Sequence, residues 1–188
     1  GSLSVPLSLL FSKFFELSAL PEIWKVAVIT PIHKKGPASD AANYRPISLT
    51  CTLCKVMESI IKIDILSYLL KHGLINKQQH GFIAKHSTCS QLLECVNDWS
   101  VSLSHKQSVD VAYIDFRRAF DSVVHAKLVL KLKSCGISGK LLEWITDFLS
   151  NRLQAVRVGK SVSSFLSVLS GVPQGSVLGI YTFSSLHK

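Results

Sequence analysis

No apolar run in this chain of 188 residues reaches the roughly 18 residues that a membrane span requires. The most apolar stretch, "VPLSLLFSKFFELSAL", is interrupted by Lys13 and Glu16. The N-terminal segment also lacks the charged start and the cleavage site of a secretory signal. We therefore expect no membrane partner. The first residue is Gly rather than Met, and this predicts a fragment of a longer protein.

Several signatures of catalysis are missing as well. The turn "PQGSVLG" is rich in glycine but does not fit G-x-x-x-x-G-K-[ST], and this disfavours a P-loop nucleotide triphosphatase. There is no G-x-S-x-G motif of a hydrolase nucleophile. The seven histidines show no H-E-x-x-H spacing of a zinc protease. Nothing in the sequence indicates a serine, histidine and aspartate triad.

Cysteines are few, and their number is odd. The five residues at positions 51, 54, 89, 95 and 135 occur without a secretory signal, which favours reduced thiols in a cytosolic or nuclear protein. Cys51 and Cys54 have the spacing of half a zinc site. No second C-x-x-C or H-x₃₋₅-H pair follows, and the surrounding "TCTLCKVMESII" has the apolar pattern of a helix. Zinc binding and core packing are both open, and the pattern favours packing.

Acidic residues are scarce: 12 Asp and Glu stand against 21 Lys and Arg, a net charge of +9. This excess favours a polyanionic partner, nucleic acid first, although many basic proteins bind none. The apolar share of 47% predicts a folded chain with a sizeable core.

Hydrophobic periodicity predicts a mixed α/β chain. We expect helices at 5–19, 49–72 and from 88 to about 99, where Thr88-x-x-Gln91 fits a capping box, and two more at 125–134 and about 139–150. Strands are expected in the first part of 24–36 and at 109–116, with a hairpin within 154–171. Segments 36–46, 76–88 and 171–179 contain the Gly and Pro residues of loops and turns.

The segment "VDVAYIDF" (109–116) raises the question of what its terminal acid faces. Alternation places Asp115 on the same face as Val111 and Tyr113 of a strand that is apolar on both faces. A carboxylate there is costly unless it is compensated. An ion pair with Arg117 or Arg118 and a metal site explain it equally well.

Four further residues can each be interpreted in two ways. Asp121 is expected to cap the following helix, with a catalytic role as the alternative. Lys34, Lys35 and Arg45 flank a flexible loop, either as a solvated basic face or as groups that bind phosphate oxygens.

Six blocks of this sequence, in order, resemble the reverse transcriptase of non-LTR (LINE-type) retrotransposons. They are "PEIWKVAVITPIHKKG", "NYRPISLT", "QHGF…STCSQL", "YIDFRRAFDSV", "LLEWITDFLSNRLQAVRVG" and "SGVPQGSVLG". The resemblance implies an RNA-directed DNA polymerase of the right-hand fold, α/β (α+β) in class. It places a fingers-like region at 1–106, a partial palm at 107–179 and a divergent tail at 180–188, with no thumb.

The resemblance also implies roles for single residues. Asp115 matches the first catalytic aspartate of the palm, which binds Mg²⁺, and hard carboxylate oxygens suit this ion. Phe120, which alone would be read as a core residue, matches the aromatic residue that selects deoxynucleotides at the sugar 2′-position. Lys34 or Lys35 and Arg45 match the fingers residues that hold the incoming triphosphate.

Gln174 and Gly175 match the palm turn that supports the nucleotide and the template. The implied partners are an RNA template, a DNA primer and dNTPs. Two departures occur in the "GFR…RST" block, where Ile83 stands for an arginine and His86 for another basic residue. Both weaken the expected grip on the template or nucleotide.

A further departure from the family pattern concerns the remaining catalytic acids. After Gly179 the family continues with Pro and then with a strand pair that bears Tyr-x-Asp-Asp, whereas here Ile180 and "YTFSSLHK" follow, and no two acidic residues are adjacent in the chain. One aspartate cannot hold two Mg²⁺ ions roughly 3.5–4 Å apart. We expect a chain that does not polymerise DNA alone. We also expect a marginal, aggregation-prone fold unless a partner completes the sheet, because without that strand pair the 109–116 strand has an unpaired edge and less cover for its apolar face. A non-catalytic nucleic-acid-binding remnant and an inert or protein-binding product are the alternatives.

Overall fold

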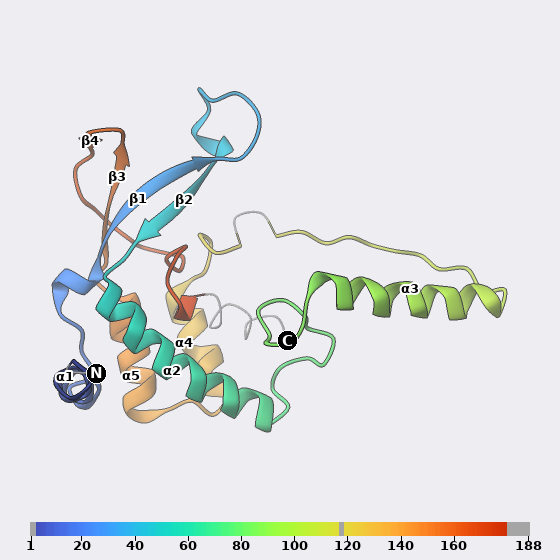
Figure 1. Ribbon diagram of the computed structural model, residues 1–188, viewed down its shortest axis with the longest axis horizontal. Coiled ribbons are helices and arrows are strands. Elements are labelled where there is room, and N and C mark those ends of the chain that lie inside the picture. The colour runs from blue at the N-terminus through green and yellow to red at the C-terminus, as the bar shows by residue number, and fades with distance from the viewer. Residues whose placement is uncertain (1–2, 117–118, 180–188) are drawn as a thin grey trace.

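A small sheet and a group of helices form the body of the chain, and one long helix projects from it (Figure 1). The computed structural model describes residues 3–116 and 119–179. The α-helices are α1 (Ser4–Glu16), α2 (Thr52–Lys71), α3 (Thr88–Ser104), α4 (His125–Ser134) and α5 (Gly139–Leu149). The strands are β1 (Val26–His33), β2 (Tyr44–Leu49), β3 (Leu153–Val158), β4 (Ser161–Val162) and β5 (Leu166–Ser167). Two short 3₁₀ helices, η1 (Glu22–Lys25) and η2 (Ala41–Asn43), precede β1 and β2.

The sheet has the order β2-β1-β3-β4, with β5 also paired to β3. β1 and β2 are antiparallel, and Pro31 lies opposite Pro46, so that the two missing N–H groups fall at one step of the ladder. β1 and β3 are parallel, with Val26 opposite Leu153. This pairing joins the two halves of the chain and confirms the expected mixed α/β class.

The core lies between α1, α2, α4 and α5. Helix α5 carries the strongest apolar face, and its Trp144, Ile145 and Phe148 are buried. The segment before β1 is attached to α5 by Asp147, which accepts hydrogen bonds from the backbone N–H of Leu20 (2.7 Å) and from Lys25 Nζ (2.6 Å). Cys54 packs in this core and Cys51 is half-buried, as expected for packing.

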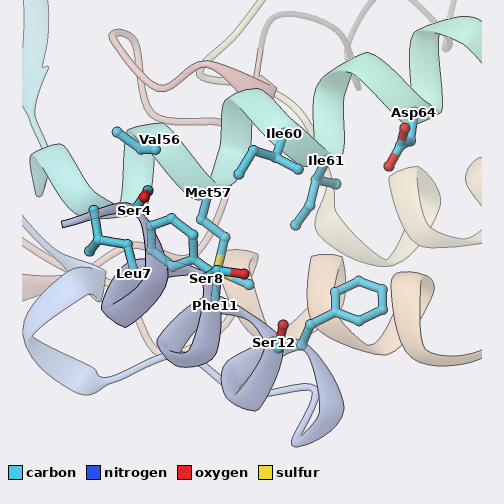
Figure 2. Close-up of a pocket in the computed structure, with 11 residues that line it drawn as sticks. Ser4, Leu7, Ser8, Phe11, Ser12, Val56, Met57, Ile60, Ile61 and Asp64 are labelled. Atoms are coloured by element: carbon cyan, nitrogen blue, oxygen red, sulfur yellow. The ribbon is translucent and has the colours of Figure 1, made fainter. Parts of the chain in front are cut away.

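An apolar groove separates α1 from α2 on the surface (Figure 2). Leu7 and Phe11 of α1 face Met57 and Ile61 of α2 across it, and Asp64 lies at one end. Its volume is about 500 Å³. None of the site residues predicted from the sequence lines this groove.

Most predicted elements are confirmed, and α4 has the bounds expected. The capping box of α3, however, begins one residue earlier than predicted. Ser87 Oγ accepts a hydrogen bond from the N–H of Ser90, and Ser90 Oγ accepts one from the N–H of Ser87, so the cap is Ser87 rather than Thr88. Strand β2 was missed because "NYRPISL" contains a proline, which β2 tolerates at the edge of the sheet.

The predicted strand 109–116 is wrong. The segment is extended but belongs to no sheet in the described part of the chain, and it runs back along α3 toward the body (Figure 1). Tyr113 and Ile114 are 87% and 83% exposed, so the expected burial on both faces is also wrong. β-Branched and aromatic residues favour a strand only where a neighbouring strand supplies hydrogen bonds and cover. Here none of the strands described does so.

Helix α3 shares this exposure. All of its residues are exposed or half-buried, and its apolar side chains form a stripe at helical spacing that includes Leu92, Val96 and Leu103. In a globular domain such a stripe normally faces a core. The α3 helix and segment 107–116 therefore form an apolar arm outside the main core.

Candidate functional site

Five of the seven residues predicted as site residues line one cleft. The cleft has a volume of about 670 Å³ and lies where β1 and β2 meet the segments around residues 115–121 and 174. Lys34, Arg45, Asp115, Phe120 and Gln174 line it. Lys35 and Gly175 adjoin lining residues in sequence but are not part of the lining themselves. Residues 34, 45, 115, 120 and 174 are thus brought together from widely separated parts of the chain.

The basic side of the cleft is built on the loop that joins β1 to β2. The N–H of Lys34 donates to the carbonyl of Asn43 (2.8 Å), which closes the loop at its base. Within the loop, Asn43 Nδ2 donates to the carbonyl of Pro37 (2.9 Å) and Tyr44 Oη donates to that of Ala38 (2.9 Å). These bonds hold the loop while Lys34 and Arg45 remain exposed at the cleft. Exposed cations on a fixed backbone suit a phosphate group.

Asp115 lies at the cleft on the exposed segment that follows α3. Asp115 is exposed, and no hydrogen bond or ion pair joins its carboxylate to another residue within 3–116 and 119–179. The alternative of an ion pair with Arg117 or Arg118 lies outside the described residues. The cost of a buried charge, from which the metal hypothesis began, does not apply at this exposed position.

The turn at 171–175 is packed tightly against the turn at 120–123. The N–H of Gly171 donates to the carbonyl of Val123 (2.8 Å), and the N–H of Val172 donates to that of Phe120 (2.9 Å). Gly171 has φ +85°, and a Cβ there would lie 2.9 Å from the Asp121 backbone, so a side chain does not fit. This contact places half-buried Phe120 in the wall of the cleft.

Gln174 is fixed by hydrogen bonds of both its backbone and its side chain. Its carbonyl accepts the N–H of Ser48 in β2 (2.7 Å), and its Nε2 donates to Asp121 Oδ1 (2.8 Å). Gly175 follows with φ +124°, and a Cβ there would lie 2.7 Å from the Ser48 carbonyl oxygen. The expected helix cap by Asp121 is wrong, because the cap position of α4 is Val124 and Asp121 instead bonds to Gln174.

The described residues do not fit a pair of magnesium ions. The cleft has two carboxylates, Asp115 and Asp121, and one oxygen of the second already accepts the Gln174 amide. Within residues 3–116 and 119–179, no three His, Cys, Asp or Glu side chains gather as metal ligands. Two-metal chemistry needs several anionic oxygens around both ions. Asp115 alone does not provide them.

A second polar cluster lies at the base of α3 and has a structural role. His80 is buried; its Nδ1 lies 2.9 Å from Ser90 Oγ and its Nε2 lies 3.1 Å from Glu94 Oε2. The set resembles a catalytic triad in composition only. Ser90 Oγ donates to the Ser87 carbonyl and accepts the Ser87 N–H, so it serves the helix cap.

Sequence reasoning missed three residues that build the site: Ser48, Glu58 and Arg152. Glu58 and Arg152 are 0% and 2% exposed, and Glu58 Oε2 accepts the N–H groups of Val177 and Leu178. The sequence does contain a pattern that indicates Glu58, because this residue lies on the same helical face as Cys54, Ile61 and Ile65. An acid within an apolar stripe indicates a buried polar contact.

Comparison with known proteins identifies the family. The sequence model described as reverse transcriptase (RNA-dependent DNA polymerase) matches residues 32–187. The chain belongs to the reverse transcriptase family. The family uses a divalent metal ion, a nucleic acid template and nucleotides. No helix in the described residues of this reverse transcriptase chain has the length and apolar character needed to cross a bilayer.

The relatives are polymerases of non-LTR elements, as the sequence blocks predicted. The chain is 36% identical over 174 residues to the probable RNA-directed DNA polymerase from transposon X-element of Drosophila melanogaster, covering 92% of this chain and 19% of that protein. It is 36% identical over 179 residues to the RNA-directed DNA polymerase from mobile element jockey of the same species, covering 95% and 19%. A type-1 retrotransposable element R2 polyprotein of Popillia japonica is 26% identical over 168 residues, covering 89% and 23%. The chain therefore spans about a fifth of the length of these relatives.

Proposed function

We propose that this chain is the fingers and part of the palm of an RNA-directed DNA polymerase, and that its cleft contacts the template, the primer and the incoming dNTP. Residues 1–106 are the fingers-like region and residues 107–179 are palm-like, with 180–188 outside both. The observation that carries the proposal is the meeting of Lys34, Arg45, Asp115, Phe120 and Gln174 at one cleft. Cations on one side and a carboxylate and an aromatic ring on the other suit a nucleoside triphosphate.

Each side chain has a role in this proposal. Lys34 and Arg45 bind phosphate oxygens, with Lys35 as a further cation beside them. Phe120 restricts the space next to the sugar, and the Gln174–Gly175 turn supports the nucleotide, since a glycine lets the backbone come close to a ligand. Asp115 is one ligand of a magnesium centre whose other ligands are not among the described residues.

Polymerisation by this chain alone is not expected, because its described residues do not supply enough ligands for two magnesium ions. A primer-extension assay with an RNA template, a DNA primer, dNTPs and Mg²⁺ tests this directly. We expect no product above that of Asp115→Ala. Mg²⁺-dependent extension that Asp115→Ala abolishes would overturn the expectation of inactivity.

The binding half of the proposal is tested separately by fluorescence anisotropy with the same primer–template at several salt concentrations. Affinity is expected to fall steeply with salt, because lysine and arginine displace counterions from phosphates. Lys34→Ala and Arg45→Ala are each expected to reduce the salt slope by about 1. Lys13→Ala, which removes an exposed cation on α1, is the matched control and should leave the slope unchanged. Equal effects of all three would contradict a specific role for the cleft.

A second candidate is a nucleic-acid-binding chain without catalysis, and the net charge of +9 favours it. It predicts binding that persists in Asp115→Ala and that does not depend on dNTPs. A dNTP-dependent increase in primer–template affinity that is lost in Arg45→Ala would favour the polymerase cleft instead.

A further inference from the structure

Behind the cleft lies a buried polar cluster that the proposed chemistry does not use. Glu58, Arg152 and Cys54 are 0%, 2% and 0% exposed. Burying a charged group is costly unless nearby groups compensate its charge. The buried Glu58 carboxylate and Arg152 guanidinium therefore need a structural explanation, which lies in the groups that they contact.

Glu58 holds the backbone of the 174–178 turn. From the middle of α2, its Oε2 accepts the N–H of Val177 (2.8 Å) and the N–H of Leu178 (2.9 Å), across about 120 residues of chain. One carboxylate oxygen thus satisfies two successive backbone donors. Leaving a buried backbone N–H without an acceptor is costly, so one oxygen that accepts from two of them is a local anchor.

The anchored segment is the one that carries Gln174 and Gly175. On its other side, the N–H of Ser48 donates to the Gln174 carbonyl (2.7 Å), and Gly175 presses against the Ser48 carbonyl. Glu58 thus holds the turn from the α2 side and Ser48 holds it from β2. With both contacts present, the Gln174 side chain remains at the cleft beside Asp121.

Arg152 places a positive charge near the buried carboxylate but forms no ion pair with it among the described residues. Its Nη1 donates to the Phe148 carbonyl (2.9 Å), and its guanidinium lies 4.9 Å from the centroid of the Phe148 ring. Burial raises the pKa of Glu58, while the hydrogen bonds from Leu178 and Val177 and the charge of Arg152 oppose that rise. Burial lowers the pKa of Arg152 in turn.

We propose that Glu58 is a positioning residue, whose buried side-chain oxygen fixes the 174–178 turn and thereby keeps Gln174 and Gly175 at the cleft. Its relevance to nucleic acid binding rests on the proposed function, whereas the anchoring itself does not. The role requires an acceptor oxygen at this point. It does not require a negative charge.

Three variants separate positioning from general stability. Glu58→Ala removes the acceptor, Glu58→Gln keeps an acceptor oxygen, and Ile65→Ala removes a buried side chain two turns further along α2. Amide hydrogen exchange is measured residue by residue in each. In Glu58→Ala we expect the amides of Val177 and Leu178 to exchange about tenfold faster than in Ile65→Ala, relative to the other α2 and α5 amides. Glu58→Gln should stay close to wild type.

Uniform acceleration across the body in Glu58→Ala, or unchanged exchange at 177–178, would overturn the proposal. If Glu58→Ala does not fold, Glu58→Asp, whose carboxylate is one methylene shorter, replaces it with the same expected pattern. Primer–template affinity is measured in parallel and should fall about tenfold in Glu58→Ala but not in Glu58→Gln. If wild type fails to bind primer–template, the proposed function fails, while the exchange pattern still decides whether Glu58 anchors the turn.

Discussion

Gln174 Nε2 donates a hydrogen bond to Asp121 Oδ1 across 2.8 Å, and this contact joins the turn after β5 to the turn before α4. Because the Asp121 side chain is exposed, the bond is screened by water and should contribute little to folding. Its value lies in fixing the Gln174 amide at the cleft, where a nucleotide is proposed to bind.

Asp121→Ala tests whether this hydrogen bond orients the Gln174 amide without stabilising the fold. The free energy of unfolding should change by less than about 1 kcal/mol, because the lost contact is solvated. The affinity for dNTP in the presence of primer–template should nevertheless fall several-fold. Asp121→Asn retains an acceptor oxygen and should restore most of the affinity. Denaturant unfolding and anisotropy titrations measure the two effects, and a large stability loss with normal affinity would contradict the assignment.

Gly175 provides a second test, based on backbone geometry. Gly175→Ala places a Cβ 2.7 Å from the Ser48 carbonyl oxygen at φ +124°, so the turn must shift or the fold must lose about 1–3 kcal/mol. Gly159→Ala is the control, because Gly159 also has a positive φ (+60°) but meets nothing within 4 Å. It should cost only the strain of the left-handed backbone, roughly 1–2 kcal/mol, and less than Gly175→Ala. Equal losses in urea unfolding would show that the contact with Ser48 is unimportant.

The elements with a strong local signal were predictable from the sequence. The α4 helix has the predicted bounds, and α2 ends where Gly73, with φ +61°, follows it. The family blocks also led to five residues that meet at one cleft. The contacts behind the site were not predictable in this way. Which backbone N–H groups bind Glu58, and which carbonyl presses on Gly175, depends on how α2, β2 and the turn pack together.

Segment 109–116 is the opposite case. Its residues strongly favour a strand, yet it does not form one. Its residues have high β-propensity, yet propensity measures how a residue fits a paired and half-covered surface. None of the strands in the described part of the chain pairs with this segment, so Tyr113 and Ile114 remain exposed. Prediction from the segment alone could not tell whether a neighbour is present.

The same exposure predicts self-association through the apolar arm. Leu93 and Ile114 are 71% and 83% exposed, and large apolar side chains exposed in this way favour aggregation. Leu93→Glu combined with Ile114→Lys should reduce the apparent mass at high protein concentration without lowering the melting temperature. Ser100→Glu adds the same charge to α3 at an exposed polar position and is the control. Sedimentation velocity and light scattering measure association, and a monodisperse wild-type monomer would contradict the prediction.

The buried carboxylate of Glu58 gives the stability of the chain a predictable dependence on pH. Burial keeps the pKa of Glu58 in the folded chain above its ordinary value of 4.5, so the folded state holds this proton more tightly than the unfolded state does. The contribution of the protonated group is therefore fully present below pH 4.5 and is lost as the pH rises through the folded pKa. Glu58→Gln has no proton to lose. Unfolding free energies measured from pH 4 to pH 9 should thus move in favour of Glu58→Gln over wild type as the pH rises, by at most about 1.4 kcal/mol per pH unit within that window. A difference that is constant with pH, or that favours wild type increasingly at high pH, would show that Glu58 enters the folded state already ionised at no cost.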